Sequence, residues 1–322
     1  MTKRREVIKA GIAALAGAHA VNAWAAEKSR SKDKEPPPRM APLMTKAVPS
    51  TGERLAVVGV GTNNYSPTTP EERAARREVL AGLTAAGAQV IDTAPAYRQS
   101  EEVIGELLAD IGNRKQAFIA TKVTAPGGDL AQGIAMIEES RRRLKTDLID
   151  LLQIHSLNGV DVLFPHLHEL KRKGQVRYIG ITTSNGNQHE QMVQIINSQP
   201  LDFVQVDYSL ANRAAAESVL PAAMAKRVGV LVNLPFGGRR DGNLFSRVAG
   251  KDLPDWAAGI GARSWSQLFL KYVVSHPAVT VAIPGMTKLA HLEDNLDAVR
   301  GKLPDAAMRL RMEKFWDENF DA

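Results

Sequence analysis

The sequence predicts one (β/α)8 barrel, the TIM barrel architecture, preceded by a signal peptide and a flexible linker. From residue 53 onward, short apolar runs alternate with amphipathic stretches, which is the pattern of parallel strands that alternate with helices. Eight such units fit into about 270 residues, the usual size of this barrel. A doubly wound open sheet is the second candidate for the same pattern.

The expected strands are short and mostly apolar, and they cover residues 55–60, 90–92, 117–122, 148–155, 178–182, 203–206, 228–233 and 279–284. Amphipathic helices are expected between them, among others at residues 70–86, 101–111, 130–144 and 162–173. Gly87 and Gly174 follow two of these stretches, as glycine commonly does at a helix C-terminus.

Residues 1–25 resemble a twin-arginine signal peptide. Arg4 and Arg5 precede a short stretch rich in Ala and Gly, and residues 23–25 (AWA) supply the small residues of a cleavage site. Residues 26–52 are rich in Pro and charge, so we expect a linker before a barrel at 53–322. These features predict export to the periplasm by the twin-arginine machinery, without stable membrane anchoring. A disordered basic N-terminus of a cytoplasmic protein is the alternative.

The net charge of +6 belongs to the N-terminal segment. Residues 1–50 hold ten Lys and Arg against four Asp and Glu, and the rest of the chain holds 31 of each sign. Non-specific nucleic-acid binding needs a basic face, so we expect no nucleic-acid partner. The chain has no Cys, which excludes disulfides and Cys-ligated metal sites, and we expect no metal.

Reactive side chains follow the apolar runs of three strings: Asp92 and Tyr97 in VIDTAPAY, Lys122 in FIATK and His155 in LLQIH. The carboxyl ends of successive parallel strands converge on one face of a barrel. A phenol has a pKa near 10, and a lysine beside it would stabilise the phenolate. Asp92 would hold Lys122, and His155 would orient a carbonyl group. The set therefore suits proton donation to a carbonyl oxygen whose carbon receives hydride.

With these strings in place, the chain resembles the aldo-keto reductases over residues 53–315. The matching strings are GVGT, DTAPAY followed by SEEVIG, ATK, DLIDLLQIH, GQVRYIGI, VQVDYSL, and VAIPG followed by LEDN. The resemblance implies a barrel that binds a nicotinamide cofactor without a Rossmann domain. It implies Tyr97 as general acid, Lys122 and Asp92 as its electrostatic support, and His155 as the group that orients the substrate.

The resemblance also implies where the cofactor binds. Gln205 matches a glutamine that binds the nicotinamide carboxamide, Thr182 and Thr183 replace a Ser-Asn pair, and Asn233 replaces a stacking aromatic residue. Gly285 and His291 stand where many members of the family carry a Lys and an Arg that favour the extra phosphate of NADP. Lys288 could still reach that phosphate, so we expect NADP, with NAD as the alternative. The loop 235–254 is a candidate clasp for the pyrophosphate. The full expected set is Gly61, Thr62, Asp92, Thr182, Thr183, Gln205, Asn233, Pro235, Phe236, Gly237, Gly285, Met286, Thr287, Lys288, His291, Asp294 and Asn295.

The expected function is NAD(P)-dependent reduction of an aldehyde or ketone to an alcohol, or the reverse, on a small-molecule substrate. The altered residues Thr183 and Asn233 leave open a low-turnover nicotinamide-binding or interaction protein. A lyase or isomerase that uses Tyr97 and His155 without hydride transfer is a third candidate. An export signal on a nicotinamide site further suggests that the cofactor is loaded before export and retained. The sequence does not identify the substrate.

Overall fold

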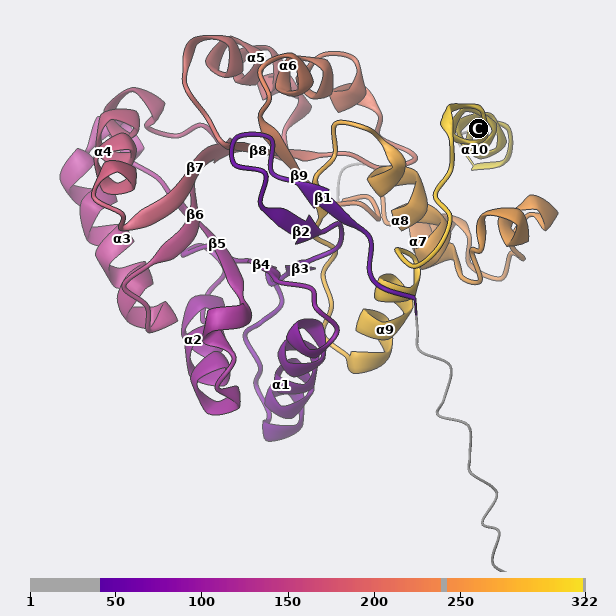
Figure 1. Cartoon of the computed structure of the whole chain (residues 1–322), viewed down its shortest axis with the longest axis horizontal. Coiled ribbons are helices and arrows are strands. Elements are labelled where there is room, and N and C mark those ends of the chain that lie inside the picture. The colour runs from indigo at the N-terminus through magenta and orange to yellow at the C-terminus, as the bar shows by residue number, and fades with distance from the viewer. Residues whose placement is uncertain (1–40, 239–241, 321–322) are drawn as a thin grey trace, which may run out of the picture. The chain divides into compact units, whose positions relative to one another are not determined.

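The structure, a computed structural model, describes residues 41–238 and 242–320. The expected signal peptide at 1–25 and residues 26–40 of the expected linker lie outside the described residues. The described chain folds around eight parallel strands that are surrounded by helices (Figure 1). These strands are β3 (Val60–Gly61), β4 (Val90–Asp92), β5 (Phe118–Val123), β6 (Ile149–His155), β7 (Val176–Thr182), β8 (Phe203–Asp207), β9 (Gly229–Asn233) and β10 (Val281–Ala282).

The eight strands close into a barrel. They pair in sequence order from β3 to β10, and every pairing is parallel. Parallel bridges between Val58 and Ala282 and between Gly61 and Gly285 join the first strand to the last. Glycine is required at residue 61, because an added Cβ would lie 2.6 Å from the Ile283 carbonyl oxygen. The (β/α)8 prediction is confirmed, and the closed order excludes the doubly wound open sheet.

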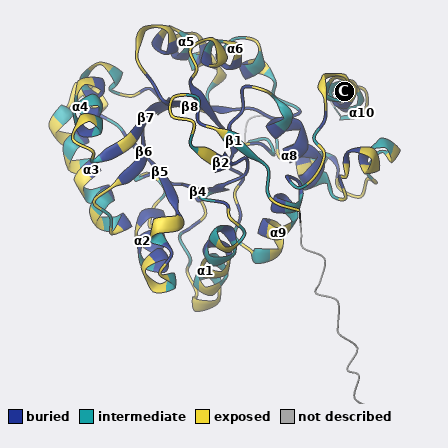
Figure 2. Ribbon diagram, in the orientation of Figure 1, coloured by how far each residue is buried: buried dark blue, intermediate teal, exposed yellow. Residues whose placement is uncertain are grey.

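Helices cover the outside of the barrel and turn their apolar sides towards the strands, as the buried residues in Figure 2 show. Their bounds are α1 (Pro70–Ala85), α2 (Ser100–Ile111), α3 (Leu130–Leu144), α4 (Val160–Arg172), α5 (His189–Ser198), α6 (Val219–Ala225), α7 (Leu244–Arg247), α8 (Trp265–Ser275), α9 (Leu289–Asp297) and α10 (Ala306–Phe320). The four expected helices agree with α1 to α4 within two residues at each end. Within the described ranges, no helix combines the length and the apolar character that crossing a membrane requires.

The barrel interior is built in layers. Val90, Leu151, Phe203 and Val281 belong to one buried cluster and come from the alternate strands β4, β6, β8 and β10. Because side chains alternate across a strand, the residues two positions further on point to the same side. These residues are Asp92, Gln153, Gln205 and Ile283. An apolar layer is therefore followed, towards the carboxyl ends of the strands, by a layer that is mostly polar.

A hairpin closes the opposite end of the barrel. Strands β1 (Thr45–Ala47) and β2 (Arg54–Ala56) pair antiparallel, and Val48 and Leu55 join the interior cluster near the first residues of the barrel strands. We call this side the closed end. Two expectations need correction here. Residues 45–47 of the linker expected at 26–52 form a strand, and the strand expected at 55–60 is divided between β2 and β3.

Candidate active site

A buried ion pair lies at the carboxyl ends of β4 and β5. Lys122 Nζ is 2.8 Å from Asp92 Oδ2, and it also donates to the Thr93 carbonyl oxygen at 2.8 Å. Lys122 is 1% exposed and Asp92 is 3% exposed, so both charges are removed from water. Burial alone would lower the pKa of Lys122, but Asp92 and Tyr97 beside it raise that pKa above its usual value. Lys122 therefore stays charged at neutral pH.

Tyr97 lies against this pair. Its ring centre is 4.9 Å from Lys122 Nζ, and its ring meets that of His155 edge to face at 6.3 Å between centres. Burial raises the pKa of Tyr97, the Lys122 charge opposes the rise, and the Asp92 charge adds to it. The phenol consequently keeps its proton over the physiological range and is available as a donor.

His155 ends β6 and is neutral. Burial lowers the pKa of His155 to about 4, and the charge of Lys122 contributes to this shift. The two following residues, Ser156 and Leu157, both have left-handed backbone, with φ of 53° and 56°. The chain thus turns sharply after His155. Strained backbone of this kind is common at functional sites. A neutral imidazole next to a protonated phenol can donate a hydrogen bond through its N–H to a carbonyl oxygen without competing as an acid.

The amide-binding residues expected on β7 and β8 divide into two groups. The Thr182 hydroxyl donates to Gln205 Oε1 at 2.7 Å, and both side chains are buried. The Thr183 hydroxyl instead donates to Gln188 Oε1 at 2.5 Å and accepts from the Asn185 backbone N–H at 3.0 Å. The Thr183 side chain therefore serves a local turn.

Asn233, at the end of β9, places an amide group next to Thr183. Its Nδ2 donates to the Thr183 carbonyl oxygen at 3.4 Å, which brings one amide to this end of the site. The following residue, Leu234, has a left-handed φ of 50°. Asn233 Oδ1 is buried and has no hydrogen-bond partner within the described part of the chain.

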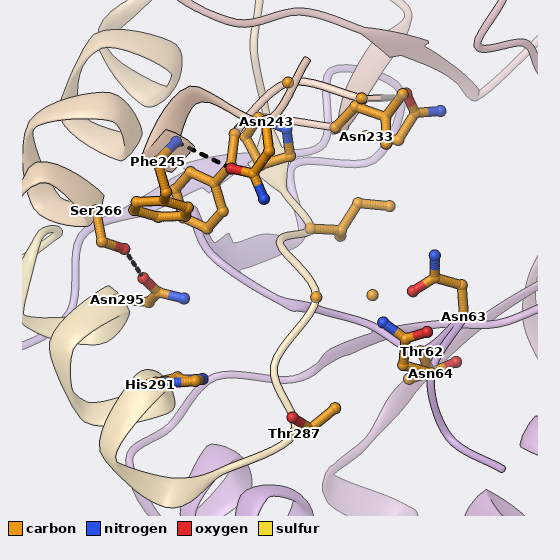
Figure 3. A pocket seen from close by; sticks show the side chains of 18 of the residues that line it. Thr62, Asn63, Asn64, Asn233, Asn243, Phe245, Ser266, Thr287, His291 and Asn295 are labelled. Carbon is orange, nitrogen blue, oxygen red and sulfur yellow. Dashed lines mark hydrogen bonds between the residues drawn. The ribbon is translucent and has the colours of Figure 1, made fainter. Parts of the chain in front are cut away.

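A long cavity of about 1120 Å³ has Tyr97 in its lining. Figure 3 shows other lining residues, among them Thr62, Asn233 and His291. The cavity begins at the ends of β3, β4 and β9 and continues past the loop after β9 to the first turns of α8 and α9. Twelve of the expected cofactor-binding residues line it: Gly61, Thr62, Asp92, Asn233, Pro235, Phe236, Gly237, Gly285, Thr287, His291, Asp294 and Asn295.

Five expected cofactor-binding residues do not line the cavity. Thr182, Thr183 and Gln205 are buried below or beside it. Met286 is fully buried in the hydrophobic core, and the exposed Lys288 precedes the first turn of α9. Strand periodicity predicts which way a side chain points. The segment after β10 has no regular period, so the sequence could not predict the directions of the side chains there. Residues 239–241 of the expected pyrophosphate clasp lie outside the described residues.

The structure also adds residues that the sequence reading missed. Gln153 Nε2 lies 3.5 Å from Asp92 Oδ1, in the same interior layer. Its signal was present, since Gln153 stands two residues before His155 in LLQIH. At the far end, Asp294 accepts from the Ser264 hydroxyl and from Gln267 Nε2, both at 2.7 Å. Nothing in the sequence linked α8 to α9 in this way.

The cavity fits a dinucleotide. Its volume exceeds the 300–1,000 Å³ typical of sites for drug-sized ligands. One end holds the proton-donating group, and the other offers hydroxyl, amide and imidazole groups, including Ser266, which donates to Asn295 Oδ1. In the described ranges, no group of three or more His, Cys, Asp or Glu is placed to hold a metal ion.

The comparison with known families identifies the class of protein. The model described as "Aldo/keto reductase family" matches residues 57–314. The chain therefore belongs to the aldo/keto reductase family. The barrel, the Asp92–Lys122 pair and the position of Tyr97 had indicated the same family before this match. Membership makes the protein an NAD(P)-dependent oxidoreductase.

Individual relatives are moderately similar. The aldo-keto reductase YhdN of Bacillus subtilis is 31% identical over 202 residues, which cover 58% of this chain and 60% of YhdN. The methylglyoxal reductase YeaE of Escherichia coli is 27% identical over 266 residues, covering 80% of this chain and 89% of YeaE.

Two solved structures share the fold. The holo form of aldo-keto reductase AKR11C1 from Bacillus halodurans superimposes with a TM-score of 0.68 at 22% identity, over 84% of this chain and 96% of that one. An aldo/keto reductase from Klebsiella pneumoniae in complex with NADP and acetate superimposes with a TM-score of 0.65 at 22% identity, over 82% of this chain and 93% of that one.

Proposed function

We propose that this protein reduces an aldehyde or a ketone to an alcohol with NADPH, and catalyses the reverse oxidation, with Tyr97 as the proton donor. One observation carries the proposal. The phenol of Tyr97 stands beside a buried, charged Lys122 at the edge of a cavity large enough for a dinucleotide. A bound nicotinamide would supply or accept the hydride, and residues of the chain donate or accept the proton.

Each residue then has a distinct task. Lys122 stabilises the phenolate that Tyr97 becomes when its proton passes to the carbonyl oxygen. Asp92 holds Lys122 charged and in place through the 2.8 Å contact. His155, neutral because burial lowers its pKa to about 4, forms a hydrogen bond to the carbonyl oxygen and orients the substrate.

NADP is the proposed cofactor, with NAD as the second choice. The similar reductase from Klebsiella pneumoniae was solved with NADP. In this chain, His291 lines the far end of the cavity, where its ring N–H would donate a hydrogen bond to the additional phosphate. Lys288 is exposed at the start of α9 and could turn towards that phosphate.

The test is an assay of the purified protein with NADPH or NADH and a panel of aldehydes and ketones. The loss of nucleotide absorbance measures turnover. Turnover with NADPH supports the proposal. Tight nucleotide binding without turnover would replace it with the low-turnover binding protein, and conversion of substrate without nucleotide would replace it with a lyase or isomerase.

We also propose that the twin-arginine machinery exports the folded protein to the periplasm with its cofactor already bound. The support is the leader itself, with Arg4 and Arg5 before an apolar stretch, joined to a fold that binds a nucleotide made in the cytoplasm. Replacing both arginines with lysine should keep the protein in the cytoplasmic fraction. Periplasmic protein that is recovered gently and contains no nucleotide would contradict the retention of the cofactor.

A further inference from the structure

Gln205 spans the mouth of the barrel. Strands β8 and β4 are four positions apart in a closed ring of eight, so they face each other across the interior. Nevertheless, Gln205 Nε2 donates to Asp92 Oδ1 at 2.7 Å. Both side chains belong to the polar layer, and Gln205 is only 1% exposed. A hydrogen bond to a carboxylate in such a dry position is among the stronger ones.

The two oxygens of Asp92 are thereby divided between two partners. Oδ1 accepts from Gln205, and Oδ2 accepts from Lys122. Gln205 is itself held in place, because its Oε1 accepts from the Thr182 hydroxyl at 2.7 Å. An amide nitrogen carries two N–H groups, so the hydrogen bond to Asp92 uses one N–H of Gln205 and leaves the second.

We propose that Gln205 is a positioning residue for proton transfer, acting on Tyr97 through Asp92 and Lys122, in addition to any contact with the cofactor. Its N–H neutralises part of the Asp92 charge and directs the other carboxylate oxygen to Lys122. Without that donor, Asp92 counteracts the Lys122 charge more completely. Less positive charge then remains for the phenolate, and Tyr97 becomes a weaker acid.

Other charged groups near this chain of contacts are few within the described residues. His155 faces Tyr97 from β6, and Glu101 on α2 lies close enough to Lys122 for their charges to interact. Asp207, two residues beyond Gln205, instead accepts from Asn212 Nδ2 at 2.7 Å. The effect of Gln205 on Tyr97 is therefore routed through Asp92, the group that Gln205 contacts directly.

The inference rests on the proposed function but is tested separately on the protein without cofactor. Tyrosine labelled with ¹³C at Cζ gives five signals, one for each Tyr, and Tyr97→Phe identifies the signal of Tyr97. Titration at alkaline pH, with circular dichroism monitoring the fold, then follows Tyr97 ionisation. In Gln205→Met we expect the midpoint to rise by roughly one pH unit, because a hydrogen bond to a charged group is lost.

Two further variants grade the effect. Thr182→Val frees Gln205 Oε1 and should produce a smaller shift in the same direction. Gln153→Met is the matched control in the same layer, and its contact with Asp92 Oδ1 is longer, at 3.5 Å. In Gln153→Met we expect the midpoint of Tyr97 ionisation to shift by less than about a third of a pH unit, since hydrogen bonds weaken at this length.

The pH dependence of alcohol oxidation, which needs the phenolate, should move upward in the same order. An unchanged Tyr97 midpoint in Gln205→Met, with weaker nucleotide binding as its single effect, would overturn the inference. Equal shifts in Gln205→Met and Gln153→Met would also overturn it, because any change in the layer would then suffice. If the protein reduced no carbonyl compound, the proposed function would fail while the titration still decided the role of Gln205.

Discussion

The two ends of the cavity are built in different ways. At the proton-transfer end, Asp92, Lys122, His155 and Gln205 project from barrel strands and Asp92 contacts both Lys122 and Gln205. At the opposite end, the lining comes from the loop after β9 and from the first turns of α8 and α9. The first end fixes charges in a dry layer, and the second presents polar groups on loops and helix ends. The groups for proton transfer are therefore placed by barrel strands, whereas the expected nucleotide-binding groups are placed by a loop and by helix ends.

Removing the proton donor should produce the largest effect. Tyr97→Phe deletes one hydroxyl, so we expect the rate of carbonyl reduction to fall by about 10²- to 10⁴-fold. Nucleotide affinity should stay nearly unchanged, because the binding groups remain. Steady-state kinetics and a nucleotide titration measure the two quantities. Activity within a few-fold of the parent protein would show that another group donates the proton.

Breaking the ion pair should reduce stability, in addition to removing the charge with which Lys122 supports Tyr97. Lys122→Met leaves Asp92 buried without its cation, and such a loss typically lowers the free energy of unfolding by about 3–5 kcal/mol. Denaturant unfolding measures it. The double variant Asp92→Asn with Lys122→Met removes both charges and should recover much of the loss. If the double variant is no more stable than the single one, the unpaired charge is not the cause.

A change at the opposite end should act on binding. His291→Ala should raise the KM for NADPH roughly tenfold and leave kcat alone, because one hydrogen bond to a charged phosphate is lost. The KM for NADH, which lacks that phosphate, is the internal control. Equal changes for both nucleotides would place His291 away from the phosphate.

The smallest effect concerns pH. The pKa of His155 is lowered to about 4, so its ionisation should not reduce the rate of carbonyl reduction between pH 5 and 8. Stability should behave differently. The unfolded chain takes up a proton on this imidazole near pH 6.5, before the folded protein does, so stability falls as pH drops from about 6.5 to 4. Unfolding of His155→Asn should depend less steeply on pH in that window. An identical slope would mean that His155 is not neutral when folded.

The same contrast explains what the sequence could predict. The sequence placed Asp92, Lys122 and His155 at one end of the barrel, because each follows an apolar run and the carboxyl ends of parallel strands converge on one face. The same pattern pointed to Gln153, two residues before His155, although Gln153 was not among the expected site residues. After β9 and β10 the chain follows no period, and hydrogen bonds that are distant in sequence decide its path. Met286 was therefore expected in the site but lies in the core, and the contact between Ser264 and Asp294 had no sequence signal.

The hairpin at the closed end has a practical consequence for immobilising the enzyme. The chain reaches the barrel there, where the Met44 N–H donates to the Val299 carbonyl oxygen, far from the cavity mouth. The C-terminal helix instead packs Phe320 against Trp265, which lines the cavity, with 5.9 Å between ring centres. Attachment to a bead or an electrode through the turn between β1 and β2 would leave the mouth facing the solution. Attachment through the C-terminus would place the support beside it.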